Sequence, residues 1–290
     1  MTLLRRANDY YELSKPRIIV LLLITTVAAM IMAAHGLPRS TLLVWTVLGG
    51  ALAAASAGAF NCVWDADVDA MMRRTRSRPI PMGRISRRAA TAFAAIAAAL
   101  SFAIFWFFVN PLAAWLSLAG NAYYVFVYTM WLKRITPLNI VVGGAAGSVP
   151  PLVGWAAVTH AIGAPALGLF ALIFLWTPPH FWSLALMTEN DYGAAKIPML
   201  PNVCGKERTR REIFYYSLLL VLASLALYPL HVMGVLYFGA AAVLGGIFVL
   251  DAARTLTDRT STLQARRLFR FSLVYLALIC AAMVIDRIIA

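Results

Sequence analysis

The sequence predicts an all-α polytopic membrane protein with about nine transmembrane helices, and three observations support this prediction. First, 62% of the 290 residues are hydrophobic and the mean hydropathy is +0.78, whereas soluble chains contain about 45–50% apolar residues. Second, the apolar residues form runs long enough to cross a bilayer. Third, the formal charge of +13 is concentrated in loops that alternate along the chain. This composition excludes intrinsic disorder and a soluble globular protein.

Each membrane-spanning helix requires roughly 20 mainly apolar residues, because a backbone inside lipid must satisfy its own hydrogen bonds. Pro111, Pro229 and the turn from Thr159 to Gly163 separate neighbouring apolar runs and predict helical hairpins. The predicted spans are 18–35, 41–63, 89–109, 111–131, 138–158, 164–187, 213–230, 232–250 and 269–289. They occupy most of the chain, so we expect a single membrane domain over residues 1–290.

The basic residues predict how the helices are oriented. Every Lys and Arg except Arg39 and Arg287 falls in the N-terminal segment or in the loops after the second, fourth, sixth and eighth spans. The positive-inside rule makes residues 1–17 and these loops cytoplasmic and places the C-terminus outside. A nucleic-acid partner is not expected, since the Arg-rich loop lies against a membrane and lacks interleaved aromatic residues for base stacking.

One group of polar residues suits a metal ion and a phosphate. Asn61, Asp65 and Asp69 recur at every fourth position where the second span ends, so they spread over about 80° of one helix face. Two carboxylates and an amide oxygen are typical ligands of Mg²⁺. Asp67 lies roughly opposite Asp65 on the helix and is expected either to support the three ligands from outside or to be solvated. The arginines of residues 73–79 suit phosphate oxygens, although a basic anchor with counter-ions is the alternative.

Two further segments contain side chains that could take part in chemistry. Glu189, Asp191 and Lys196 follow the sixth span and repeat the acidic and basic pattern more weakly, as ordinary loops also do. Within the sixth span, the segment from Trp176 to His180 contains two prolines and predicts a broken helix, since proline cannot donate a backbone hydrogen bond. Its aromatic residues, and Trp182 beyond them, either face lipid or line an interior chamber.

The order of motifs along the chain resembles a known family. Asn61-x-x-x-Asp65-x-x-x-Asp69, followed by Arg74-Thr75-x-x-Arg78-Pro79, resembles the first aspartate-rich motif of the UbiA-type intramembrane prenyltransferases. Five other segments resemble the protoheme IX farnesyltransferase (haem O synthase) branch of that family: YELSKPR at 11–17, YTMWLKRITPLN at 128–139, GGAAGSVPPLVGW at 143–155, WTPPHFW at 176–182 and DYGAAKIPMLP at 191–201. The resemblance covers roughly residues 10–289.

This resemblance implies a fold and a reaction. The fold would be a UbiA-type bundle of nine helices in the bacterial inner membrane, with a central cavity that opens to the cytoplasmic side. The reaction would transfer the farnesyl group of farnesyl diphosphate to the 2-vinyl group of haem b, with addition of water, giving haem O and diphosphate. Haem would be a substrate, since the sequence has no Cys-x-x-Cys-His motif for covalent attachment. Implied partners besides the lipid bilayer are haem A synthase and terminal oxidase assembly.

Carried over residue by residue, the resemblance assigns Mg²⁺ to Asn61, Asp65 and Asp69, with Arg74 and Arg78 on the oxygens of the diphosphate. These charges would stabilise the departing diphosphate, so that the allylic C–O bond ionises toward a farnesyl cation. A closed apolar chamber would keep water from capturing that cation.

The second acidic motif of the family is incomplete in this chain. Only Asp191 and the offset Glu189 stand where the family has a full Asp-x-x-x-Asp. We therefore do not expect a second metal ion held chiefly by protein, and basic side chains would neutralise charge instead: Lys133, Arg134 and Lys196.

The resemblance makes His180 a candidate to contact haem or to handle the proton of the added water, beside Trp176 and Trp182. Three alternatives stay open: a UbiA-type transferase of an aromatic quinone precursor, a membrane transporter with a midplane site at the broken helix, and a scaffold without catalysis. A transporter has less support, because the sequence shows no inverted repeat and transport would not require the triad beside an Arg-rich loop.

Overall fold

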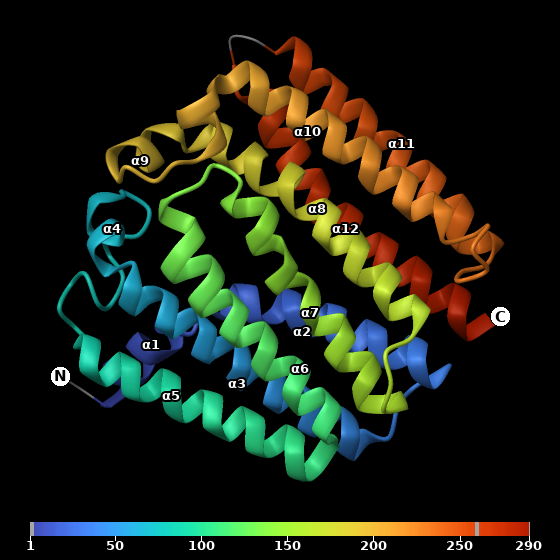
Figure 1. The fold of residues 1–290 in the computed structure, drawn as a ribbon, viewed down its shortest axis with the longest axis horizontal. Coiled ribbons are helices and arrows are strands. Elements are labelled where there is room, and N and C mark those ends of the chain that lie inside the picture. The colour runs from blue at the N-terminus through green and yellow to red at the C-terminus, as the bar shows by residue number, and fades with distance from the viewer. Residues whose placement is uncertain (1–2, 259–260, 290) are drawn as a thin grey trace.

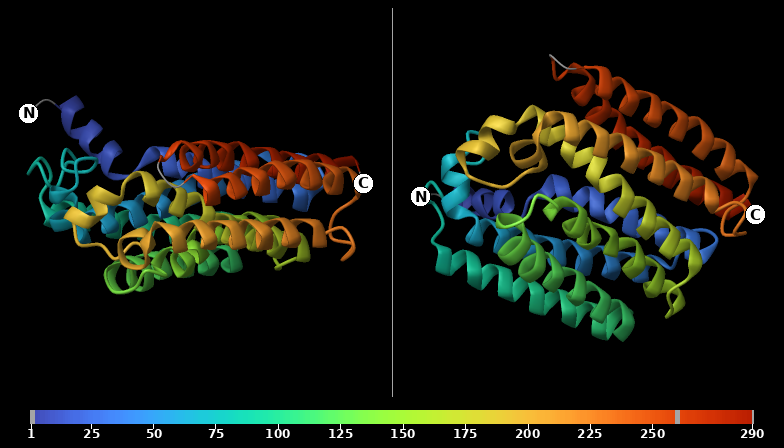
Figure 2. Two further views of the ribbon diagram at one scale, coloured as in Figure 1. Left: turned by 90° about the horizontal axis from the view of Figure 1, so that it is seen from above. Right: turned by 45° about the horizontal axis from the view of Figure 1, so that its top comes forward.

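A computed structural model describes residues 3–258 and 261–289 of the protein. These residues form helices and connecting turns, with no strand. Figure 1 shows the long helices running side by side between two ends of the molecule, with α4 and α9 at one of them. The two views in Figure 2 show the same helices stacked in a flattened bundle. The prediction of an all-α bundle is confirmed.

Most of the chain is α-helical, with two π-helical segments (η1 and η2) and one 3₁₀ turn (η3). In chain order the elements are α1 (Leu3–Leu13), α2 (Pro16–Ala34), α3 (Ser40–Trp64), α4 (Ala66–Met71), α5 (Arg87–Ile104), η1 (Phe105–Val109), α6 (Pro111–Ala122), η2 (Tyr123–Trp131), η3 (Leu132–Arg134), α7 (Asn139–Thr159), α8 (Ala164–Met187), α9 (Glu189–Ala194), α10 (Leu200–Ala226), α11 (Val235–Thr257) and α12 (Leu263–Ile289).

Seven helices of the described residues are long and apolar enough to cross a membrane: α2, α3, α5 with η1, α7, α8, α11 and α12. The two other predicted spans are less regular. Residues 111–131 divide between α6 and the π-helical η2, and residues 213–230 overlap the apolar end of α10. The start of α10 is highly charged and contains the non-helical Gly205. The chain is thus an integral membrane protein, while the number of nine spans stays a prediction.

The helices pack as two groups joined by a central pair. On one side α3 packs on α5, and on the other α8 packs on α10 and α12. Helices α2 and α7 lie against each other, and each also contacts a member of both groups. A Cβ atom added to Gly154 of α7 would lie 2.2 Å from the backbone oxygen of Thr26 in α2. The two backbones approach so closely that only glycine fits at this position.

The predicted hairpins are present. Pro111 begins α6 directly after Asn110, whose side chain accepts a hydrogen bond from the Ala113 amide at 2.9 Å. The same Asn110 side chain donates to the Ala156 carbonyl oxygen at 2.8 Å, which fixes the hairpin against α7. Pro229 lies in the turn that joins α10 to α11.

The prediction of a broken helix at Pro178 and Pro179 is wrong, because α8 continues through both residues to Met187. Both prolines are buried, and neighbouring helices surround this part of α8. Packing from α7, α10 and α12 holds the helix together where proline removes backbone donors.

The N-terminal helix α1 is tied to the segment that follows α4. Arg84 contacts Asp9 at 2.8 Å and Glu12 at 3.1 Å, so one guanidinium group joins two carboxylates of α1. Lys15 then takes a left-handed conformation, with a φ of 58°, which redirects the chain into α2. These contacts place Lys15 against the end of α3.

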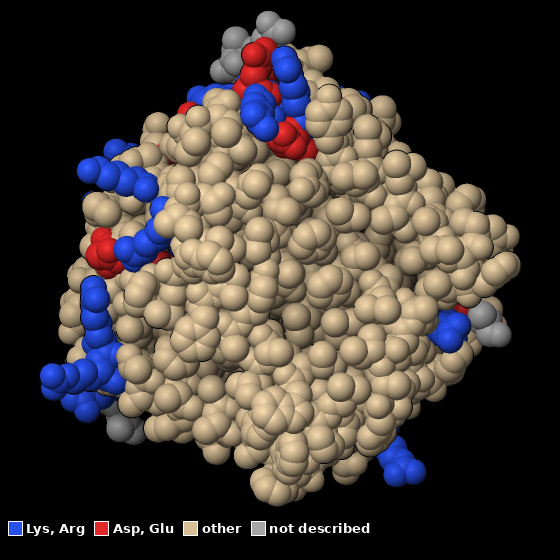
Figure 3. Space-filling model, in the orientation of Figure 1, with Lys and Arg blue, Asp and Glu red and all other residues tan. Residues whose placement is uncertain are grey.

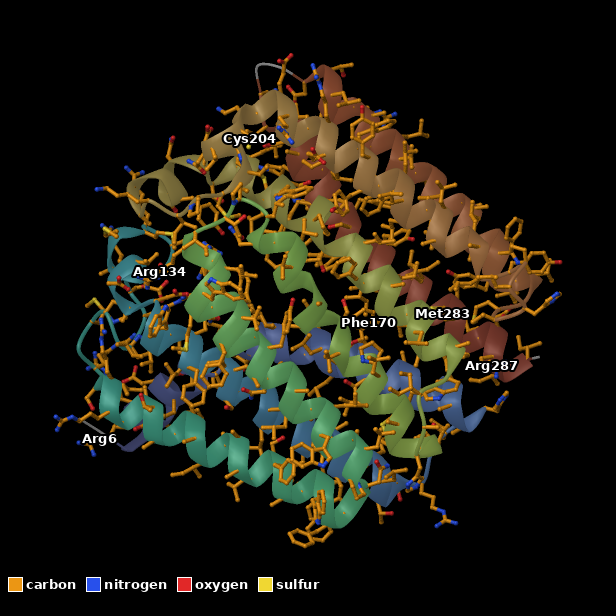
Figure 4. The ribbon with its side chains drawn as sticks, in the orientation of Figure 1. Arg6, Arg134, Phe170, Cys204, Met283 and Arg287 are labelled. Carbon is orange, nitrogen blue, oxygen red and sulfur yellow. The ribbon has the colours of Figure 1, made fainter. Side chains whose placement is uncertain are left out.

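Charged side chains gather near the ends of the helices. Figure 3 shows a broad uncharged surface across the middle of one face, as a lipid-contacting protein requires. Figure 4 shows Arg6 and Arg134 at one end of the bundle and Arg287 at the other. Arg259, one of the basic loop residues, lies outside the described residues. Which end faces the cytoplasm stays a prediction.

Candidate active site

The three oxygen-bearing residues predicted from their spacing come together, although the helix that carries them is interrupted. Helix α3 ends at Trp64, and Asp65 separates it from α4. The amide of Asp65 nevertheless donates to Asn61 at 2.9 Å, and the amide of Asp69 donates to Asp65 at 2.7 Å. These helical hydrogen bonds keep the three side chains in register. All three are buried, and we call them the oxygen triad.

Cationic side chains from three other segments contact the oxygen triad. The Lys15 ammonium donates to Asn61 Oδ1, and the Lys133 ammonium donates to Asp65 Oδ2. Arg78 Nη1 lies 2.7 Å from Asp69 Oδ2. We call Lys15, Arg78 and Lys133 the cation set. Each member of the triad thus has its own cation.

The remaining polar contacts fix the geometry of the triad. Asn61 Nδ2 donates to Asp65 Oδ2 at 2.9 Å and to Thr129 Oγ1, on η2, at 3.1 Å. The Thr75 hydroxyl donates to the backbone oxygen of Asp69 at 3.0 Å. These bonds leave the side-chain oxygen of Asn61 directed at Lys15. The amide oxygen and both carboxylates therefore face cations.

The exposed Asp67 behaves as the sequence predicts. Its side chain is 53% exposed and pairs with Arg134, whose Nη atoms donate to both carboxylate oxygens at 2.8 and 2.9 Å. Arg134 also donates to the Trp64 carbonyl oxygen at 2.8 Å, at the end of α3. The hydrogen bond from Arg134 holds the pKa of Asp67 below its usual value. Arg134 thus anchors the helix end, 3.6 Å from Asp65 Oδ1.

The charges of the cation set influence one another. Burial opposes the charge of Lys133, but contact with the Asp65 carboxylate outweighs this effect and raises the pKa of Lys133. Burial lowers the pKa of Lys15, and the nearby positive charges of Arg78 and Lys133 lower it further. An anion that entered between these groups would relieve their mutual repulsion.

The donor atoms of the oxygen triad fit a hard divalent cation. Asp65 Oδ1 is buried and accepts no hydrogen bond from any described residue. Oxygen atoms from two carboxylates and one amide are ligands that Mg²⁺ prefers, whereas zinc sites use nitrogen and sulfur. No group of three or more His, Cys, Asp or Glu that could hold a metal occurs among the described residues. The oxygen triad contains two carboxylates and the amide of Asn61, so it is not a group of that kind, and it is the candidate metal centre.

The second loop predicted to take part lies next to the first. Figure 1 shows α9 beside α4, and Arg74 Nη2 lies 3.4 Å from the Tyr192 hydroxyl on α9. Asp191 precedes Tyr192 on this short helix, while Lys196 follows it with a φ of 52°. Glu189 is held by Lys206 at 2.7 Å. The loop thus brings Asp191 to the same end of the molecule as the oxygen triad.

The aromatic residues predicted on the sixth span form a separate cluster. The His180 ring stacks between Trp176, at 4.3 Å between centroids, and Phe269 of α12, at 4.7 Å. His180 Nδ1 lies 2.7 Å from the Ser272 hydroxyl, and Trp176 Nε1 donates to the Ser272 carbonyl oxygen at 2.8 Å. We call Trp176, His180 and Phe269 the α8 stack. Its contacts are with α12, and none of them reaches the oxygen triad.

Trp182 belongs to the packing between α8 and α10. Its ring meets Tyr216 edge to face at 5.3 Å, and it is almost fully buried. Sequence reasoning grouped it with Trp176 because both are aromatic and lie on the same span.

Sequence reasoning missed Lys15, Thr129 and Tyr192 as site residues. Lys15 and Tyr192 lie within the segments that carry the family resemblance, and Thr129 lies within YTMWLKRITPLN. Their position in segments that resemble the family was the signal in the sequence that could have identified them as site residues.

Comparison with known proteins identifies the family. The model of the UbiA prenyltransferase family matches residues 22–274, which is most of the chain. The chain belongs to the UbiA prenyltransferase family. Family membership makes it a prenyltransferase, in agreement with the resemblance seen in the motifs.

UbiA-family relatives cover nearly the whole chain. A protein of Synechocystis sp. named protoheme IX farnesyltransferase is 54% identical over 280 residues, which are 96% of this chain and 89% of the relative. A protein of Rippkaea orientalis with the same name is 52% identical over 98% of this chain and 88% of its own length. A third, from Gloeobacter violaceus, is 53% identical over 97% and 92% of the two chains.

Solved structures support the UbiA fold. A structure described as a digeranylgeranylglyceryl phosphate synthase in membranes superposes with a TM-score of 0.82 and 19% identity, over 99% of this chain and all of the other. A UbiA homologue from Archaeoglobus fulgidus bound to DMAPP and Mg²⁺ has a TM-score of 0.64 and 17% identity, over 95% and 99% of the two chains. At such identities the likeness concerns the fold alone.

Proposed function

We propose that the chain transfers the farnesyl group of farnesyl diphosphate to the 2-vinyl group of haem b, with addition of water, giving haem O and diphosphate. The observation that carries the transfer chemistry is the contact between the buried oxygen triad and the cation set. The choice of donor and acceptor is supported by relatives at 52–54% identity that are named protoheme IX farnesyltransferase.

We assign Mg²⁺ to the oxygen triad. The buried Asp65 Oδ1 has no hydrogen bond within the described residues and is available as a ligand. When bound, the metal would supply positive charge against the diphosphate as its leaving oxygen becomes negative. The UbiA homologue bound to DMAPP and Mg²⁺ supports this assignment by its fold.

The cation set and Arg74 would hold the diphosphate. Lys133 and Arg78 now neutralise Asp65 and Asp69. Phosphate oxygens offer these cations stronger anionic partners, and guanidinium groups bind them through paired hydrogen bonds. Arg74 extends this surface toward α9, where its guanidinium group contacts Tyr192. Asp191 and Lys196 would border the diphosphate on that side, and Arg134 would keep the end of α3 in place.

In the proposed reaction, the farnesyl group leaves the diphosphate before it joins haem. The allylic C–O bond breaks and its electron pair leaves with the diphosphate, whose charge the cation set stabilises. The π electrons of the haem vinyl group then form a bond to C1 of the farnesyl group, which leaves a cation on the vinyl carbon next to the porphyrin. Water adds its oxygen to this carbon and loses a proton. One hydroxyl-bearing product and one diphosphate result.

We propose that the α8 stack, flanked by Trp182, serves the haem side of the reaction. Its aromatic faces suit a flat porphyrin, and His180 is the one titratable group within the stack. Its Nδ1 is engaged by Ser272, which orients the imidazole ring. His180 would then contact haem or accept the proton that the added water loses.

We further propose that the chain is one domain in the bacterial inner membrane. The N-terminus and the large loops would lie in the cytoplasm and the C-terminus outside, as the distribution of Lys and Arg predicts. The active site would open to the cytoplasmic side. Haem A synthase and terminal oxidase assembly would receive the product.

The purified protein, supplied with haem b, farnesyl diphosphate and Mg²⁺, tests the proposal. Mass spectrometry should detect haem carrying one hydroxyethylfarnesyl group, and Asp65→Ala should not produce it. A farnesylated aromatic acid in place of farnesylated haem, in a competition between the two acceptors, would replace the haem assignment. The absence of any farnesylated product from a folded wild-type protein would contradict the transferase itself.

A further inference from the structure

A groove on the outer flank of α11 and α12 is separate from the oxygen triad. It has a volume of 430 Å³ and is lined by basic and apolar side chains. The lining residues are Ile247, Asp251, Leu263, Arg266, Arg267, Arg270, Phe271 and Val274. We call this the α11–α12 groove. Both of its helices are among those apolar enough to span a membrane, and its apolar residues Leu263 and Val274 are exposed.

Most of the apolar side chains of the groove lie deeper along the helices than its arginines. The three arginines lie within the first eight residues of α12, at the end of the bundle where the chain turns from α11, and Leu263 precedes them. Phe271 directly follows Arg270, Val274 lies about one turn beyond Arg270, and Ile247 lies at the depth of Phe271 on α11 because the two helices are antiparallel. The groove thus has a cationic entrance and an apolar interior, in the order that a phospholipid presents from headgroup to acyl chain.

The arginines differ in their partners. Arg267 lies 3.0 Å from the buried carboxylate of Asp251, and Arg254 lies 2.9 Å from the same carboxylate. Arg266 and Arg270 form no ion pair with a described residue, and both are exposed. Asp251 therefore holds Arg267 against the helices, while Arg266 and Arg270 are available to an external anion.

We propose that the α11–α12 groove binds one acidic phospholipid, with its phosphate between Arg266 and Arg270 and an acyl chain along Phe271, Val274 and Ile247. Three guanidinium groups against one carboxylate give the groove a net positive charge, which favours an anionic headgroup over a zwitterionic one. A prenyl diphosphate also combines anion and chain, but the only carboxylate here is already held by Arg254 and Arg267 and offers no metal site for a diphosphate. The observations therefore favour the phospholipid.

Native mass spectrometry of the purified full-length protein in detergent tests this proposal. The delipidated protein is titrated with phosphatidylglycerol or with phosphatidylcholine of the same acyl chains. We expect one tightly bound phosphatidylglycerol and weaker binding of phosphatidylcholine. Arg266→Gln with Arg270→Gln should weaken phosphatidylglycerol binding at least about tenfold, since each basic residue near a membrane surface contributes about 1 kcal/mol to attraction of anionic lipid.

A matched control removes the same charge elsewhere. Arg87 and Arg88 are exposed and begin α5, another membrane helix, but do not line the groove. Arg87→Gln with Arg88→Gln should leave phosphatidylglycerol binding within about twofold of the wild type. Equal losses in the two double variants, or equal affinity of the wild type for both lipids, would overturn the proposal.

A second variant keeps the test decisive if the Arg266 and Arg270 changes impair folding. Val274 is 50% exposed, so Val274→Trp fills the groove without burying new volume in the core. It should lower the affinity for phosphatidylglycerol while leaving the thermal unfolding midpoint in detergent unchanged. Unchanged lipid affinity in this variant would show that the lipid binds elsewhere. Displacement of phosphatidylglycerol by an equimolar amount of farnesyl diphosphate would assign the groove to the prenyl substrate instead.

Discussion

The oxygen triad and the α8 stack both have buried side chains at their centre, but different interactions hold the two regions. In the first region, each buried carboxylate is neutralised by a cation, Asp69 by Arg78 from the turn that follows α4 and Asp65 by Lys133 from a distant part of the chain. In the second, neutral rings stack and share hydrogen bonds with a single residue, Ser272. Ion pairs can be exchanged for a charged ligand at little net cost, whereas stacked rings mainly provide a flat, apolar surface. The first region suits diphosphate and metal, and the second suits a planar acceptor.

Among the changes that test this comparison, Asp65→Asn is expected to have the largest effect on turnover. The variant keeps the size of the side chain but removes the charge that would hold Mg²⁺, so turnover should fall about 1,000-fold. Formation of farnesylated haem, measured by mass spectrometry, gives the rate. Asp67→Asn is the matched control, since Asp67 is 53% exposed and pairs with Arg134, which is not in the cation set. Equal losses in the two variants would contradict the assignment of the metal to the triad.

Lys133→Met tests whether the ion pairs of the first region also stabilise the fold. Removing the cation leaves the buried Asp65 carboxylate without a cation in direct contact, with the Asn61 amide as its hydrogen-bond donor and Arg134 3.6 Å away, which should cost about 3 kcal/mol of unfolding free energy. Denaturation of the protein in mixed micelles gives this value. Asp65→Asn combined with Lys133→Met should recover much of the loss, because no unpaired charge remains. Additive losses in the double variant would show that the two residues do not interact.

His180→Phe tests the α8 stack. The ring remains, so stacking with Trp176 and Phe269 should persist, but the nitrogen atoms are lost. We expect the affinity for haem to fall about tenfold, a change of about 1.4 kcal/mol, while the affinity for farnesyl diphosphate is unchanged. Absorbance titration with haem and calorimetry with farnesyl diphosphate measure the two affinities. Weaker binding of farnesyl diphosphate with unchanged binding of haem would reverse the assignment of the two regions.

The smallest expected effect is on the unfolding free energy and concerns Asp67 and Arg134. This partly exposed pair lies between the first region and solvent. The hydrogen bond from Arg134 holds the pKa of Asp67 below its usual value, so the stabilisation is complete above the unfolded pKa and is lost as the pH falls through the lower folded pKa. Since both groups are partly exposed, Asp67→Asn should cost less than about 1 kcal/mol at neutral pH, and less in high salt. Unfolding measured from pH 7 into acid should show the difference between wild type and variant shrinking once the pH falls below the usual pKa of an aspartate. A difference that stays constant or grows as the pH falls below that value would contradict this account.

The sequence predicted the parts of the site that lie within one helix. The spacing of Asn61, Asp65 and Asp69 placed them on one face, and that face is retained even though the helix is interrupted at Asp65. Periodicity cannot predict which distant residues approach that face, so Lys15 and Thr129 were missed. Lys15 reaches it through a left-handed turn, which sequence patterns do not specify.

Similar causes explain why the sequence did not predict two features of the fold, the continuous helix α8 and the π-helical segment η2. Two prolines in α8 predicted a break because local rules count only backbone donors. Packing by neighbouring helices kept the helix continuous, and such packing is known only once the bundle is formed. The span 111–131 looked uniform in hydropathy, but Tyr123–Trp131 is π-helical.

The positions that build the two regions also set the order in which they can form during synthesis. The oxygen triad, the cation set and Arg84, which ties α1 to the rest, all lie before residue 135. All of them are therefore synthesised before the second half of the chain. The α8 stack requires Phe269 and Ser272 from the last helix. The residues of the charged centre are thus available early in synthesis, whereas the aromatic centre cannot form before α12 has been made.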